Sequence, residues 1–138
     1  MGCLRLGYFE NFMGNNTLLL DGDIEGLSEL AQALSVLAIG GRDVVAVHSL
    51  PFVSALHQVE LSAHRFHRDV GVSKTRDGFQ WQRSSAGWAA VVEQVLAVKH
   101  QGRCHQYLDA PSDDLTVMVS SGEYGEPWPK FGATPWAR

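Results

Sequence analysis

The segment 23-DIEGLSELAQALSVLAIGG-41 carries the clearest structural signal in the chain. Its apolar residues recur at intervals of three and four positions, which places them in one stripe along an α-helix. The members of that stripe are Ile24, Leu27, Leu30, Ala31, Leu34, Leu37 and Ala38. Asp23 is a favourable N-cap, and Gly40 and Gly41 are typical of a helix end. The segment therefore predicts a helix over 24–39 that packs one face against a sheet.

A second helix is predicted over 86–100, within 85-SAGWAAVVEQVLAVKH-100. Its apolar stripe consists of Trp88, Val91, Val92, Val95 and Leu96. Ser85 can cap the start of this helix, and Gly102 ends it. Because valine is a weak helix former, tertiary packing has to stabilise the helix.

Segments of alternating or β-branched apolar residues flank both helices, and the links between most of them are short, which favours antiparallel pairing. The expected strands lie near 3–11, 17–20, 43–50, 57–66, 70–72 and 79–81, with two more inside 102–124. The apolar run at 17–20 can be a strand that is buried on both faces. The order predicts one α+β domain over 1–124, with two helices packed on one face of an antiparallel sheet.

The last segment, 125-GEPWPKFGATPWAR-138, differs in character because it is rich in proline and tryptophan. Proline lacks a backbone donor and fixes φ, so neither a helix nor a strand ladder is expected to run through this tail. We expect Trp128 to pack against the domain, since an exposed indole leaves a large apolar surface in water.

Composition excludes several classes of protein. The chain has 138 residues, of which 45% are apolar and 19% charged, as in ordinary globular domains. The net charge of −4 argues against a nucleic-acid partner, because such proteins are usually basic. Two cysteines are too few for a secreted disulfide scaffold, and no apolar run reaches the roughly 20 residues of a spanning helix. We therefore expect a cytoplasmic protein with neither a membrane nor a nucleic-acid partner.

Sequence motifs that carry a known chemistry are missing: there is no GxSxG elbow, glycine-rich phosphate loop or dinucleotide fingerprint. His64 and His67 have HxxH spacing, but side chains an odd number of positions apart on a strand point to opposite faces. No cysteine pair or HExxH pattern supports zinc. The sequence therefore predicts no catalytic residue, metal site or cofactor. It favours a binding protein over an enzyme.

A set of polar side chains that could form a site lies in the stretch 102-GRCHQYLDAPSDDLTVMVSSGEY-124. Strand alternation places His105, Tyr107 and Asp109 on one face, and Glu123 follows the next strand. Across a hairpin, His105 can approach a residue between Ser120 and Glu123. A His105–Glu123 pair could act as a general acid and base in a small enzyme or ligand-binding protein. It could equally complete a structural polar network, and both interpretations stay open.

The same stretch resembles small bacterial α+β proteins of the polymorphic-toxin immunity type. The resemblance rests on His105, Tyr107, Leu108, Asp109, Ser120, Gly122, Glu123 and Tyr124. In that pattern a glycine often precedes the histidine directly, whereas here Cys104 intervenes and Gly102 lies three residues upstream. The resemblance implies a non-catalytic immunity protein that binds another protein, a cognate toxin. The partner-binding candidates are His105, Tyr107, Asp109, Glu123, Tyr124 and Trp128.

Overall fold

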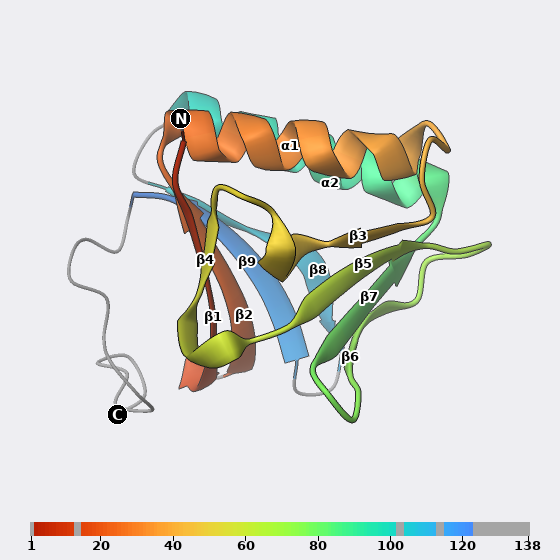
Figure 1. Cartoon of the computed structure of the whole chain (residues 1–138), viewed down its shortest axis with the longest axis horizontal. Coiled ribbons are helices and arrows are strands. Elements are labelled where there is room, and N and C mark those ends of the chain that lie inside the picture. Colours follow the sequence, from red (N-terminus) through yellow and green to blue (C-terminus); the bar gives the residue numbers. More distant parts are fainter. Residues whose placement is uncertain (1, 13–14, 102–103, 113–114, 123–138) are drawn as a thin grey trace.

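The computed structural model describes residues 2–12, 15–101, 104–112 and 115–122. Within them, two helices and nine strands form an α+β fold with two sheets, which confirms the predicted fold class (Figure 1). The strands divide into two sheets where one antiparallel sheet was expected, and both are mixed. Long connections separate the strands of the parallel pairs, because the chain has to cross back along the sheet before a parallel strand can begin.

The five-stranded sheet has the order β4-β1-β2-β9-β8. Its strands are β1 (Leu4–Phe12), β2 (Asn15–Gly22), β4 (Val53–Ala55), β8 (His105–Ser112) and β9 (Leu115–Ser121). The β1–β2 and β8–β9 pairs are antiparallel, as the sequence predicts for both hairpins. They join through a parallel pairing of β2 with β9, and β4 adds to β1 in parallel.

The four-stranded sheet has the order β3-β5-β7-β6. Its strands are β3 (Val44–Ala46), β5 (Leu61–Arg65), β6 (Gly71–Lys74) and β7 (Phe79–Arg83). The predicted hairpin at Asp77-Gly78 is confirmed, and the Thr75 N–H donates to the Gly78 carbonyl at 2.7 Å. The strands expected at 43–50 and 57–66 are shorter, because the 3₁₀ turns η1 (Val47–Ser49) and η2 (Leu56–Gln58) interrupt them. In η2, His57 has a φ of 55°, which an extended strand cannot accommodate.

The helices α1 (Ile24–Ala38) and α2 (Ser85–Gln101) lie side by side and cover the two sheets from one side (Figure 1). Asp23 caps α1 as predicted, accepting the Gly26 N–H at 2.6 Å. Ile24, expected in the buried stripe, is 60% exposed because it opens the helix at the margin of the buried face. Ser84 rather than Ser85 caps α2, since its hydroxyl accepts the Gly87 N–H at 3.0 Å.

The main core lies between the helices and the inner faces of both sheets. Trp81 of β7 and Trp88 of α2 are fully buried there, as the sequence predicts, with ring centroids 4.7 Å apart in an edge-on arrangement. The Trp88 indole N–H donates to the His64 carbonyl at 2.9 Å. The two tryptophans thereby fix α2 onto the four-stranded sheet.

A close approach of backbones explains a glycine inside α1. A Cβ on Gly26 would lie 2.2 Å from the Cys3 carbonyl oxygen, well inside van der Waals contact. The start of β1 therefore packs directly on the first turn of α1, and Cys3 accepts the Asp23 N–H at 3.2 Å. This contact positions the five-stranded sheet beneath the helix.

Candidate functional site

The five-stranded sheet has an outer face, which is the face turned away from both helices. Leu6, Leu20 and Val119 point inward to the main core. Because side chains alternate along a strand, the neighbours of these residues point to the outer face. His105 and Tyr107 of β8 pair with Ser120 and Met118 and share this outer face.

A row of polar residues crosses the outer face at one level, with one residue from each strand. In register order across the sheet, the polar row is Ser54, Arg5, Asp21, Ser120 and His105. Ser120 and Asp21 are 99 positions apart in sequence and meet only because β2 and β9 pair in parallel.

Asp21 is the centre of the polar row and is 2% exposed. Its Oδ2 accepts from Arg5 Nη2 at 2.7 Å, and its Oδ1 accepts from the fully buried Ser120 hydroxyl at 2.6 Å. Hydrogen bonds to a charged group are stronger than neutral ones, and a buried carboxylate needs them to offset its lost hydration. The network therefore holds β1, β2 and β9 together at this level.

His105 and Tyr107 lie beside the polar row on β8, at the end of the sheet. Their rings are 6.0 Å apart and nearly perpendicular. His105 is half-buried and pairs with Ser120, which agrees with the predicted approach across the hairpin, whereas Tyr107 is 42% exposed. The two side chains form the accessible margin of the outer face.

The side chains of the other sequence-predicted candidates lie outside what the structure describes. The β8–β9 register shifts between Tyr107 and Asp109, and Asp109 pairs with Val117. The shared face of Asp109 and His105 stays a prediction, because the structure describes the backbone of Asp109 and not its side chain. Glu123, Tyr124 and Trp128 lie outside the described residues, as does the whole tail 125–138.

An apolar group adjoins the polar row on the same face. The outer-face cluster consists of Phe9, Phe12, Leu19 and Met118, all at most 3% exposed, with Leu56 packed against it. Leu18, Leu19 and Leu20 are each fully buried, which confirms that the run at 17–20 is buried on both faces. Leu19 and Met118 are register partners in the two central strands.

The chemistry of the polar row favours a structural network. The Ser120 hydroxyl donates to Asp21, whose other carboxylate oxygen is held by Arg5, so both side chains are committed to the network. The hydroxyl is also fully buried, out of reach of a substrate. The polar row fixes the strand that carries His105, because Ser120 is the register partner of His105.

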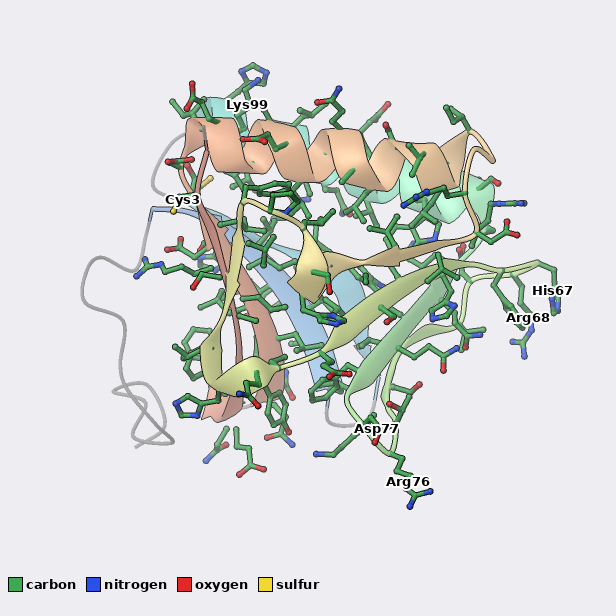
Figure 2. The ribbon with its side chains drawn as sticks, viewed as in Figure 1. Cys3, His67, Arg68, Arg76, Asp77 and Lys99 are labelled. Atoms are coloured by element: carbon green, nitrogen blue, oxygen red, sulfur yellow. The ribbon has the colours of Figure 1, made fainter. Side chains whose placement is uncertain are left out.

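The two histidines with HxxH spacing lie in different local surroundings. His64 lies in β5, while His67 follows the strand and contacts Phe66, with ring centroids 4.2 Å apart and the ring planes tilted by 41°. Figure 2 shows His67 and Arg68 projecting together from this loop. Across the part of the chain that the structure describes, no group of three or more His, Cys, Asp or Glu side chains is placed to hold a metal ion.

One carboxyl outside the polar row has a perturbed pKa. The Ser84 backbone N–H donates to Asp69 Oδ1 at 2.8 Å, and the Ser84 hydroxyl donates at 3.0 Å. These bonds, the backbone one foremost, together with the nearby Arg83 charge, lower the pKa of Asp69 below its usual range. Asp69 therefore strengthens the cap of α2 and has no contact with the outer face.

Comparison of the chain with protein-family models, with curated proteins and with solved structures found no match. Among the described residues, neither helix combines the length and the apolar character needed to cross a membrane.

The sequence did not reveal Arg5, Asp21 and Ser120 as one network. Arg5 and Asp21 follow from the β1–β2 hairpin register, which strand alternation could have suggested. Ser120 joins them only through the parallel β2–β9 pairing, for which the sequence carries no local signal.

Proposed function

We propose that this protein is a non-catalytic binding module whose partner contacts the His105–Tyr107 margin of the five-stranded sheet. One observation supports this proposal above the others. Five large apolar side chains are exposed among the described residues, and Tyr107 is the one aromatic among them. Tyrosine is enriched at the energetic centres of protein interfaces, because it offers a large contact area with little rotamer entropy to lose.

The surroundings of Tyr107 also suit recognition. His105 contacts its ring edge-on, and the polar row beneath fixes the pair of strands that carries both residues. A preorganised contact surface loses less entropy on binding than a mobile one. Arg83 donates to the Leu108 carbonyl at 2.9 Å, which covers part of the edge of β8. We therefore propose contact through side chains rather than addition of a partner strand to this edge.

The proposed class of partner is a toxin that this protein neutralises. That step rests on the resemblance of 102–124 to immunity-type proteins, in which His105 and Tyr107 are two of the matched positions. The chemistry of the polar row agrees with a protein that acts by occupying its partner, because the buried hydroxyl is committed to Asp21.

A photo-crosslinking amino acid at position 107 tests the proposal in the source cell. The matched control carries the same amino acid at position 39, because Ile39 is 80% exposed at the far end of α1. We expect one partner to be captured from position 107 and not from position 39. Equal capture from both positions would count against the proposed surface.

The captured partner then tests the toxin proposal separately. Its expression alone should arrest growth, and co-expression of this protein should restore growth. Tyr107→Ala should abolish the rescue while Ile39→Ala keeps it. A captured partner that is harmless to the cell would leave the binding surface standing and would refute the immunity function.

A further inference from the structure

The sequence Arg-Asp-Val occurs twice in the chain, at 42–44 and at 68–70. The first copy leads into β3, and the second directly precedes β6. These are the two edge strands of the four-stranded sheet, whose order is β3-β5-β7-β6. Both copies lie at the same end of that sheet, because the register places Val44 and Gly71 at one level across it. Together they form the twin motifs of the four-stranded sheet.

The aspartate of each motif is paired within the chain. Asp43 accepts a hydrogen bond from the Arg65 side chain at the end of β5, and its carbonyl accepts the Arg65 N–H at 2.8 Å. Asp69 Oδ1 lies 3.7 Å from Arg83 Nε at the end of β7. Each ion pair joins a motif to the strand beside its edge strand, so the two motifs are held in similar settings.

The arginine and the valine of each motif are accessible. Arg42 and Arg68 are exposed, and neither belongs to an ion pair within the described part of the chain. Arg68 lies 5.9 Å from the centre of the Phe66 ring, and Figure 2 shows it projecting from its loop. Val44 is 45% exposed and Val70 is 43% exposed. Each motif therefore presents a guanidinium group and an aliphatic side chain to solvent.

This end of the four-stranded sheet is positive in an acidic protein. The twin motifs and the two arginines that pair with them contain four arginines and two aspartates, a net charge of +2. Of the 11 lysines and arginines of the chain the other seven remain, and of its 15 acidic residues the other thirteen, a net charge of −6. A segment that carries carboxylates is therefore attracted to this end and repelled by the rest of the chain.

We infer that the twin motifs bind an extended acidic segment of a partner protein. The planar guanidinium of arginine is suited to bidentate contact with a carboxylate, and the valine beside each arginine adds an apolar contact. Three strand spacings of about 4.8 Å separate the motifs, so they lie roughly 14 Å apart. An extended segment spans that distance in about four residues.

A protein segment fits the twin motifs better than a nucleic acid does. A phosphate backbone would gain nothing from the exposed valines, and the two aspartates would repel it. The motifs also belong to the four-stranded sheet, whereas the His105–Tyr107 margin belongs to the five-stranded sheet. The inference therefore does not depend on the function proposed for that margin.

Two short peptides provide a test with the unaltered full chain. The probe is a capped Val-Glu-Val-Gly-Val-Glu-Val peptide, whose glutamates are four positions apart, and the control peptide has lysine in place of both glutamates. We expect the probe to shift the backbone amide NMR signals of both motifs at low salt, with a response that weakens as salt is added. The lysine peptide should leave these signals unchanged. Signals that stay in place at millimolar probe, or that move equally with the lysine peptide, would overturn the inference.

Variants of the full chain separate the twin motifs from other basic residues. Arg42→Gln combined with Arg68→Gln should weaken binding of the probe by about fivefold or more, because two exposed ion pairs are lost. The matched control is Arg76→Gln, since Arg76 is followed by Asp77 but then by glycine in place of valine. Figure 2 shows both of these side chains at the tip of the β6–β7 hairpin. The control should leave the Kd unchanged, and an equal loss from both variants would mean a general charge effect and no site.

Three further results would also refute the inference. If the motif signals shift as the protein concentration is raised without peptide, a second copy of the chain is the occupant. If a short single-stranded oligonucleotide shifts them at a lower concentration than the probe, phosphate is the preferred ligand. If the probe shifts the signals of one motif alone, the two motifs do not act together.

Discussion

Removal of the Asp21 carboxylate should destabilise the protein far more than removal of a surface carboxylate. Asp21 is 2% exposed and accepts two short hydrogen bonds, from Arg5 and Ser120. Each hydrogen bond to a charged group contributes about 1.5–3 kcal/mol. Removing one partner of a buried ion pair typically costs about 3–5 kcal/mol. We therefore expect Asp21→Ala to lower the free energy of unfolding by about 3–5 kcal/mol.

The chain contains a matched control of the same residue types. Arg65 donates to Asp43 at 2.5 Å, but Asp43 is 74% exposed. Exposed ion pairs contribute about 0–1 kcal/mol, because water screens the charges and the side chains lose rotamer freedom. Asp43→Ala should therefore lower the free energy of unfolding by less than about 1 kcal/mol.

A double-mutant cycle separates the pair energy from the loss of the side chains. Arg5→Met leaves Asp21 buried without its cation, so it should be strongly destabilising by itself. The cycle also needs Asp21→Leu by itself, and its double variant, Arg5→Met with Asp21→Leu, replaces both charges with apolar volume. We expect the double variant to be more stable than either single variant, with a coupling energy of at least about 1.5 kcal/mol.

Urea denaturation followed by circular dichroism gives the free energy and the m-value for each variant. An unchanged m-value shows that the extent of unfolding is the same. The reasoning is refuted if Asp21→Ala costs no more than Asp43→Ala, or if the Arg5 and Asp21 effects are additive.

Three further predictions concern the fold around the site. Gly26→Ala should lower the free energy of unfolding by about 1–3 kcal/mol, because the new Cβ clashes with the Cys3 carbonyl. This clash outweighs the gain of about 1 kcal/mol in helix propensity. A variant that is more stable in urea denaturation would show that the contact is loose. Leu30→Ala should lower the free energy of unfolding by about 2–4 kcal/mol in the same assay, because Leu30 is fully buried in the α1 stripe. Ile39→Ala, at an exposed position, should lower it by less than about 0.5 kcal/mol. Equal losses would place the stripe at the surface. The pKa of Asp69 is lowered in the folded state, so its contribution to stability is present above the unfolded value of about 3.9 and is lost as the pH falls through the folded pKa. The stability gap between the native chain and Asp69→Asn should therefore narrow below about pH 4, and a gap that stays constant through acid would contradict the assignment.

The helices were predictable because their signals are local. The stripe of α1 and the Asp23 cap lie within one continuous segment, and the structure reproduces both. The three hairpins were likewise predictable from alternation and turn residues. The division into two sheets was not, because it depends on how β2 finds β9 and how β5 finds β7 across long connections. The glycine at position 26 of α1 is likewise explained by a contact with Cys3, which is distant in sequence.

The candidate site was likewise predictable where it depends on one hairpin and not where it depends on distant strands. Hairpin geometry predicted that His105 approaches a residue between Ser120 and Glu123, and the structure pairs it with Ser120. The bulge before Asp109 was not predictable, since it changes pairing without a glycine or proline at the shift. The burial of Asp21 depends on a strand from the opposite end of the chain, so its partner Ser120 could not be inferred from the sequence around either residue.

The affinity of the purified partner for three forms of this protein tests the binding account most directly. Isothermal titration should give the same Kd for the native chain and for Ile39→Ala, because Ile39 caps α1 and the outer face is turned away from both helices. Tyr107→Ala should weaken binding by about 30-fold or more, which corresponds to the loss of about 2 kcal/mol at an interface hot spot. Circular dichroism should show that Tyr107→Ala is folded. An unchanged Kd for folded Tyr107→Ala would contradict the proposal that the partner contacts the His105–Tyr107 margin.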